Sequence, residues 1–187
     1  MKQYKEITEA IYKVAKKVSK ELPFHATGIE KQLQEAMAYE FRKAKKEIQA
    51  VREFFGEIYY NNFPVKDYRP DFVIFPDKNW KLSQTIIIET KFGGVKELAS
   101  GREELFRYLY SSSQSSTDYI RNSNIGMLIL WESTTTDMPT GTSKVAIEEL
   151  ESMELGSFQA REFNVIVETW EVDPKNNKKF IKTLVYK

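Results

Sequence analysis

Apolar residues recur every three or four positions near the start of the chain. They are Ile7, Ile11, Val14, Val18 and Leu22. This spacing is typical of one face of an amphipathic α-helix, and Pro23 follows directly. We therefore predict a helix over residues 5–22 that ends before the proline. The polar side carries Lys13, Lys16, Lys17 and Lys20. We interpret these lysines as a solvated face rather than as a stripe that tracks phosphates.

The same helical spacing returns after a break. Its positions are Ile29, Leu33, Met37, Phe41, Ala44 and Ile48. Thr27 or Gly28 is a suitable cap, so we predict a second helix that starts there and continues past Ile48. From about Phe54 the pattern changes to aromatic and β-branched residues, which favours a strand around residues 58–60.

Two short apolar runs come next, and each lies beside a carboxylate. Residues 72–75 come directly after Asp71, and residues 85–88 come directly before Glu89. Runs of this length and composition are typical of strands buried on both faces. Residues 76–84 between them are rich in turn-forming types. We predict an antiparallel hairpin that brings Asp71 and Glu89 to the same end of a sheet.

The end of this hairpin gathers groups that suit a metal site. Two carboxylates can hold a hard divalent cation such as Mg²⁺. Lys91 lies two residues after Glu89 and projects from the same face of the strand. Its amine can there reach an activated water or a phosphate oxygen. Taken singly, each residue also has a plainer interpretation: Asp71 as a turn cap, and Glu89 with Lys91 as an ion pair worth under about 1 kcal/mol.

The remainder of the chain adds further elements. We predict a loop at 92–94, and then a helix with Leu98, Leu105, Phe106 and Leu109 on its apolar side. A serine-rich connector at 111–117 and a strand at 125–131 should follow. After them we predict a mobile loop at 133–143, a short helix at 144–155, and a hairpin of 163–171 and 180–186. This order indicates an α/β (α+β) fold, with a central mixed sheet flanked by helices. At 187 residues with 41% hydrophobic content, one domain spanning 1–187 is expected.

Composition narrows the chemistry. Without cysteine there is no disulfide, zinc ribbon or thiol nucleophile, and His25 is the only histidine. Oxygen ligands favour Mg²⁺ or Mn²⁺ over zinc. The formal charge of +1 excludes a wholly polybasic binder. No apolar stretch is long enough for a membrane span and the start is polar, so we predict an intracellular protein, in the cytoplasm or in that of a host if the chain is viral.

Pro70-Asp71 and then Glu89-Thr90-Lys91, each beside a predicted strand, resemble the motifs of the PD-(D/E)XK, or restriction-endonuclease-like, nuclease superfamily. Glu30 resembles the helical glutamate that precedes the core sheet in the GxxExxY group. Residues 104–109 and the strand at 125–131 resemble the helix and strand that come after the lysine in that group. The resemblance covers about residues 27–131 and leaves out the first helix and the C-terminal part at 144–187. Glu104 stands where the family often has glutamine, and Gly28 precedes Glu30 by two residues rather than three.

The resemblance implies a function. Asp71, Glu89, the backbone carbonyl of Thr90 and Glu30 would bind Mg²⁺ or Mn²⁺, and Lys91 would orient the attacking water or stabilise the charged transition state. The reaction would be hydrolysis of DNA phosphodiester bonds, and the enzyme would be an endonuclease. It would act in recombination, repair, restriction or viral DNA processing. A homodimer would suit paired cuts in two strands.

Other side chains near the motif have open roles. Tyr68 and Arg69 precede the motif and are candidates to contact a phosphate, although an arginine beside a carboxylate is as often a structural partner. Tyr59, Tyr60 and Trp131 suit base stacking, but core packing is favoured. His25 has no expected catalytic role.

Two other functions stay open at this point. One is a catalytically inactive nucleic-acid-binding or assembly module with the same fold. The other is an unrelated α/β protein whose acidic residues bind a structural cation or none.

Overall fold

The computed structural model describes residues 4–22, 29–60, 63–113, 115, 118–121, 123–132 and 163–187. The helices are α1 (Lys5–Glu21), α2 (Ile29–Lys43), α3 (Val95–Ser112) and α4 (Asp118–Arg121). The strands are β1 (Ala50–Arg52), β2 (Gly56–Tyr60), β3 (Phe63–Tyr68), β4 (Phe72–Ile74), β5 (Ile86–Gly93), β6 (Ile125–Glu132), β7 (Asn164–Asp173) and β8 (Asn176–Tyr186).

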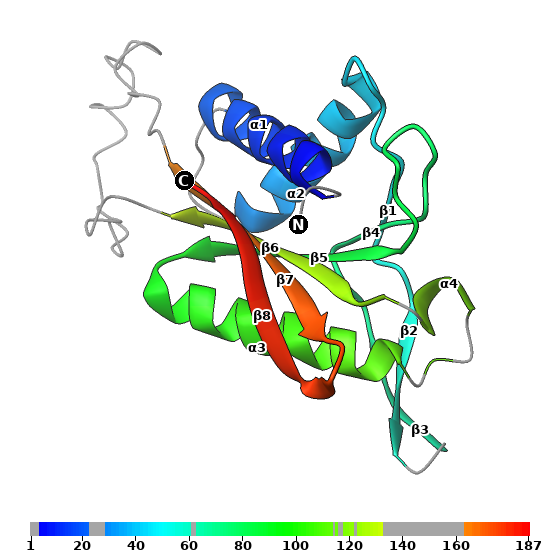
Figure 1. Ribbon diagram of the computed structural model, residues 1–187. Coiled ribbons are helices and arrows are strands. Elements are labelled where there is room, and N and C mark those ends of the chain that lie inside the picture. The colour runs from blue at the N-terminus through cyan, green and yellow to red at the C-terminus, as the bar shows by residue number, and fades with distance from the viewer. Residues whose placement is uncertain are drawn as a thin grey trace, which may run out of the picture.

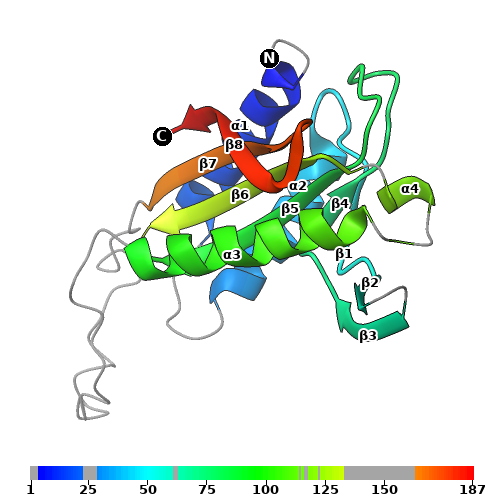
Figure 2. The ribbon, with the colours of Figure 1, turned by 60° about the horizontal axis from the view of Figure 1, so that its bottom comes forward.

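A six-stranded mixed sheet runs through the middle of the protein in the order β1-β4-β5-β6-β7-β8. β5 and β6 are parallel, and the other neighbouring pairs are antiparallel. α1 and α2 cover one face of the sheet and α3 covers the other (Figure 1). β2 and β3 form a separate hairpin that projects away from this sheet (Figure 2). The arrangement confirms the predicted α/β fold with a mixed central sheet.

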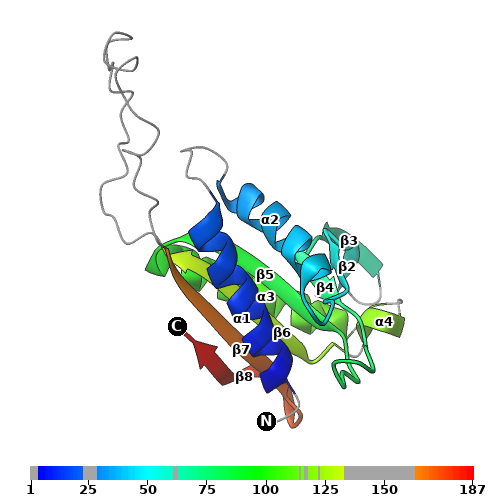
Figure 3. The same cartoon turned by 90° about the horizontal axis from the view of Figure 1, so that it is seen from above.

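The apolar run of β5 is buried on both faces of the sheet, as its composition predicts. Ile86 and Ile88 pack on the side of α1 and α2, in the larger apolar cluster. Ile87 lies on the opposite side, in a smaller cluster with residues of α3. This alternation results from the strand geometry, in which successive side chains point to opposite faces. Seen from above, α1 and α2 lie side by side across the sheet (Figure 3).

Two glycines allow α3 to approach the sheet closely. A Cβ atom on Gly126 of β6 would lie 2.7 Å from Leu105 Cδ1 of α3. A Cβ atom on Gly101 of α3 would lie 2.8 Å from Lys91 Cγ of β5. A real side chain at either position would require its neighbours to move. The absence of side chains there brings α3 directly over the half of β5 that carries Glu89 and Lys91.

A buried carboxylate ties the C-terminal hairpin to α3. Glu168 of β7 is 3% exposed. It accepts two hydrogen bonds from Arg102 of α3, at 2.8 and 2.6 Å, and one from Lys182 of β8 at 3.0 Å. Burial alone raises the pKa of a carboxyl group, but these donors outweigh it and hold the pKa of Glu168 below its ordinary value. Glu168 is therefore an anion that joins three elements.

Three boundaries differ from the sequence prediction. α2 ends at Lys43 and does not reach Ile48. The Ile48 side chain is nevertheless only 1% exposed, because the Ile48 N–H donates to the carbonyl of Phe41 and the chain turns back toward the core there. β5 continues through Gly93 instead of ending in a loop at 92–94, because it pairs with β6 along its whole length. The predicted connector at 111–117 begins inside α3, where Ser112 Oγ donates to the carbonyls of Leu109 and Ser123.

The other predicted elements of the described part of the chain are confirmed. The helix expected at 5–22 is α1, the hairpin of 72–75 and 85–91 is β4 with β5, the strand at 125–131 is β6, and the closing hairpin is β7 with β8. The loop at 133–143, the helix at 144–155, His25 and the side chains of Tyr59 and Tyr60 lie outside the described residues. None of the described helices combines the length and apolar character that crossing a membrane requires.

Candidate active site

Asp71 and Glu89 meet where β4 and β5 separate. The antiparallel register pairs Phe72 with Ile88, so Asp71 and Glu89 occupy the next opposed position. β4 begins only at Phe72, whereas β5 continues to Gly93 with β6 as its neighbour. The backbone of β5 from Glu89 onward therefore has one side that β4 does not cover. The two residues thus lie at the same end of the hairpin, as the sequence predicts, and the Asp71 charge acts on Glu89.

Asp71 is held in place by Thr90. Its Oδ2 atom accepts hydrogen bonds from the Thr90 backbone N–H and from the Thr90 hydroxyl, each 2.7 Å long. The same hydroxyl oxygen accepts a bond of 2.8 Å from Gln34 Nε2 on α2. Thr90 and Gln34 are both buried. The chain of contacts from α2 through β5 fixes the orientation of the Asp71 carboxylate.

Lys91 links β5 to α3. Its Nζ atom donates to Glu89 Oε1 at 2.6 Å and to Glu104 Oε2 at 3.0 Å. Burial disfavours the ammonium ion, but the charges and hydrogen bonds of these two carboxylates outweigh it and raise the pKa of Lys91 above its ordinary value. Lys91 is therefore a fixed cation between two acidic side chains.

Glu30 approaches from the other face of the sheet. It lies in the first turn of α2, and its Oε2 atom accepts a hydrogen bond of 2.9 Å from the backbone N–H of Phe92. Burial, as the largest effect, raises the pKa of Glu30, and the charges of Asp71 and Glu104 act in the same direction. Glu30 therefore lies near enough to Asp71 and Glu104 for their charges to act on it.

Glu89 is the most perturbed of these acids. It is 3% exposed, and its Oε2 atom is buried without a hydrogen-bond partner. Burial and the nearby Asp71 charge raise the pKa of Glu89 to about 9. Burial also raises the pKa of Asp71. In the metal-free protein, burial and the Asp71 charge therefore favour the protonated form of Glu89, whereas its 2.6 Å contact with Lys91 favours the carboxylate. Glu104 is a second counter-ion of Lys91.

The pKa of Glu104 agrees with this distribution of charge. Burial acts to raise it, but the neighbouring Glu89 and Lys91 side chains outweigh burial and lower the pKa of Glu104 below its ordinary value. In the sequence, Glu104 stands out only because glutamine is frequent there in the resembled family. Its contact with Lys91 results from its position three residues after Gly101, on the side of α3 that approaches β5.

The acidic residues fit a divalent cation, although no ready-made cage is present. Among the described residues, no group of three or more His, Cys, Asp or Glu side chains is gathered closely enough to hold a metal ion. The buried Oε2 of Glu89 nevertheless lacks any donor, which is costly unless a proton or a cation satisfies it. Both bonds from Thr90 go to Oδ2 of Asp71 rather than to Oδ1. Hard oxygen donors of this kind suit Mg²⁺ or Mn²⁺.

The aromatic residues near the motif are packed. Tyr68 is 4% exposed and its ring stacks on Tyr108 of α3, with centroids 4.9 Å apart and planes 16° apart. This leaves the ring little surface for a nucleic acid, in contrast to the role considered from the sequence. Trp131 is fully buried and donates to the Ala15 carbonyl, as core packing requires. Arg69, directly before the motif, is exposed.

Gln34 is the residue that sequence reasoning missed at this site. The signal for it was present, because Gln34 comes four residues after Glu30 and the two lie on the same face of α2. The sequence alone does not predict that this face contacts Thr90, because the contact depends on how α2 packs across β5.

A comparison with protein families supplies the assignment that this geometry suggests. The family model described as the PD-(D/E)XK nuclease superfamily matches residues 5–132. The chain belongs to this superfamily. The match starts in α1, so the first helix, which lies outside the sequence resemblance, is part of the family region, whereas β7 and β8 lie beyond it. The GxxExxY subtype is not confirmed by this match. Comparisons with curated proteins and with solved structures gave no match.

Proposed function

We propose that the protein is a metal-dependent DNA nuclease, and specifically an endonuclease. The observation that carries the proposal is that Asp71 and Glu89 occupy the opposed positions just beyond the Phe72–Ile88 pair of β4 and β5, with Lys91 bonded to Glu89. Membership of the PD-(D/E)XK nuclease superfamily supports it. Mg²⁺ or Mn²⁺ is the proposed cofactor, because the available ligands are oxygens.

The proposed ligands are Asp71, Glu89, the backbone carbonyl of Thr90 and, directly or through water, Glu30. A bound divalent cation would shield the phosphodiester charge and lower the pKa of a water molecule. The chain prepares this site by holding Asp71 through Thr90 and by burying Glu89 where its own proton must leave before it can act as a ligand. The catalytic set proposed here is therefore Asp71, Glu89, Lys91 and Glu30.

Lys91 is proposed to orient the attacking water or to stabilise charge on the phosphorane-like transition state. Glu104 has a positioning role in this scheme. When Glu89 binds a cation, Glu104 still accepts a hydrogen bond from Lys91 Nζ and keeps the ammonium group in place. Without Glu104, Lys91 would then have neither of the two carboxylate partners.

The proposed substrate is DNA, and the proposed assembly is a homodimer, because a cut in each strand of a duplex needs two sites. Arg69 is proposed to contact a phosphate beside the cut, since it is exposed and precedes Asp71 by two residues. The pathway would be recombination, repair, restriction or viral DNA processing, within the cell.

The decisive experiment is incubation of the purified protein with supercoiled, linear, branched and single-stranded DNA, and with RNA, with and without Mg²⁺. We expect Mg²⁺-dependent cleavage of DNA, internal cuts in the supercoiled form, and loss of cleavage in Glu89→Gln and Lys91→Ala. Glu103→Gln is the matched control, because Glu103 is an exposed acid beside Glu104 on α3. Cleavage that survives in Glu89→Gln would overturn the assignment of the site.

A further inference from the structure

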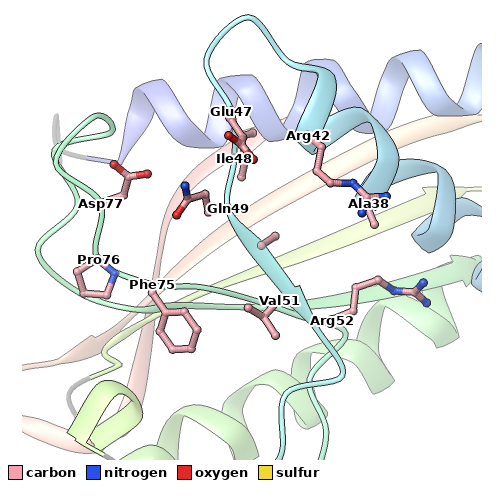
Figure 4. Close-up of a pocket in the computed structure, with 11 residues that line it drawn as sticks. Ala38, Arg42, Glu47, Ile48, Gln49, Val51, Arg52, Phe75, Pro76 and Asp77 are labelled. Atoms are coloured by element: carbon pink, nitrogen blue, oxygen red, sulfur yellow. The ribbon is translucent and has the colours of Figure 1, made fainter.

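A pocket of about 440 Å³ lies at the edge of the sheet formed by β1. It is formed by the C-terminal part of α2, strand β1 and the segment after β4 (Figure 4). Its volume is in the range of sites that hold small ligands. Arg42 of α2 and Arg52 of β1 line one end, whereas Pro76 and Asp77 line another. Figure 4 shows both arginine side chains extending away from Pro76 and Asp77.

Two acids, Glu47 and Asp77, also line the pocket, but neither is an ion-pair partner of Arg42 or Arg52 among the described residues. Within the described part of the chain, neither Arg42 nor Arg52 forms an ion pair or a side-chain hydrogen bond, although other lysines and arginines of this protein do. The Nε atom of Arg52 is buried and has no hydrogen-bond partner. An unsatisfied buried donor is costly. An anion in the pocket that accepts from Arg52 Nε removes this cost, and the exposed Arg42 can donate to the same anion.

The pocket and the candidate active site share α2 and the strands next to Asp71. Glu30, Gln34, Ala38 and Arg42 are four residues apart in succession, so they form one stripe along α2. The first two contact β5 at Phe92 and Thr90, and the last two line the pocket. On the sheet side, Arg52 pairs with Phe72, the residue after Asp71. The arginine end of the pocket is therefore the end nearest the Asp71 carboxylate.

We propose that Arg42 and Arg52 bind a backbone phosphate of the nucleic acid, next to the phosphate that is cleaved. Arginine suits this ligand because its planar guanidinium can donate two parallel hydrogen bonds to phosphate oxygens. The two sites would then hold neighbouring phosphates of one DNA strand in different ways. The acidic centre requires a bound cation before it accepts a phosphate, whereas the two arginines bind a phosphate directly. This inference rests on the proposed function in taking DNA as the ligand.

The test is DNA binding measured by fluorescence anisotropy across a series of salt concentrations, with EDTA present to prevent cleavage. Each phosphate contact that is lost lowers the steepness of log Kd against log salt by about 0.9 for duplex DNA. We expect this change, with about tenfold weaker binding, in Arg42→Gln and in Arg52→Gln. Arg52→Lys keeps the charge and should keep the slope while binding more weakly. It also guards against a loss of folding in the glutamine variant.

Lys175→Gln is the matched control, because it removes one positive charge at the turn between β7 and β8, which are at the opposite edge of the sheet from β1. Its slope should equal that of the wild type. Slopes in both arginine variants that also equal the wild type would overturn the proposal. A free nucleotide is the alternative source of the phosphate: calorimetric binding of a mononucleotide that is lost in Arg52→Gln, with an unchanged DNA slope, would likewise overturn it.

The two hypotheses fail in different ways. DNA binding that depends on the two arginines, in a protein that cuts no DNA in Mg²⁺, would remove the proposed catalysis and keep this phosphate site. Mg²⁺-dependent cleavage with wild-type salt slopes in both arginine variants would remove the phosphate site and keep the catalysis.

Discussion

Asp71 receives both the backbone N–H and the hydroxyl of Thr90 on one carboxylate oxygen, each at 2.7 Å. The variable residue of the Glu-X-Lys motif thus orients the aspartate of the other motif. Because the hydroxyl also accepts from Gln34, the contact extends to α2. The Thr90 side chain therefore joins the Pro-Asp motif to the Glu-X-Lys motif, although neither motif requires threonine at that position.

Replacement of Thr90 tests this link. Thr90→Val keeps the shape and the backbone N–H but removes the hydroxyl, so Asp71 loses one donor and Gln34 loses its acceptor. Supporting contacts of this kind typically change metal affinity or activity by about 10- to 100-fold. We expect that loss in Mn²⁺ affinity measured by calorimetry. Thr90→Ser retains the hydroxyl and should stay within a few-fold of the wild type; equal loss in both variants would contradict the role of the hydroxyl.

Glu104→Gln tests the positioning of Lys91. Glutamine keeps a hydrogen-bond acceptor but removes the charge that helps to raise the pKa of Lys91. We expect kcat to fall about tenfold with little change in KM, because Lys91 Nζ is then held less firmly beside Glu89. A purely structural role of Glu104 would lower Tm and leave kcat unchanged.

Glu89→Gln should stabilise the metal-free protein at alkaline pH. The pKa of Glu89 rises from 4.5 to about 9 on folding, so between these values the unfolded chain has released a proton that the folded protein retains. Stability contributed by this site therefore falls as pH rises through that window. Glutamine abolishes the dependence. We expect Tm at pH 8 to increase by about 3 °C or more, the shift that about 1 kcal/mol produces in a domain of this size.

The matched comparison for that experiment is pH 4, where Glu89 is protonated in both states and the variant should melt close to the wild type. A variant with the same decline in Tm from pH 5 to pH 9 as the wild type would show that Glu89 is ionised in the folded protein.

The sequence predicted the hairpin and the residues at its end well, because strand alternation and turn-forming residues are local properties. Asp71, Glu89 and Lys91 could be placed together from the two apolar runs alone. The end of α2 was missed, because the apolar spacing continues to Ile48 although the chain turns after Lys43. Local periodicity does not distinguish a longer helix from a turn that returns an apolar side chain to the same core.

Contacts between elements could not be predicted. Glu104 and Gln34 act on the motif from helices on opposite faces of the sheet, and their roles depend on how closely those helices pack. For α3 that distance is set by Gly101 and Gly126, which mark a close approach only once the opposed residues are known. The pocket between α2 and β1 depends in the same way on tertiary packing.

The claim on which the account depends is that Asp71 and Glu89 together bind a divalent cation. Calorimetric titration with Mn²⁺ at pH 7.5, in two buffers that differ in ionisation enthalpy, tests it directly. We predict binding in the micromolar to millimolar range, with release of about one proton per ion as Glu89 ionises. Asp71→Asn and Glu89→Gln should each abolish it, and Glu103→Gln should not. Binding that persists in both site variants, or none in the wild type, would contradict the account.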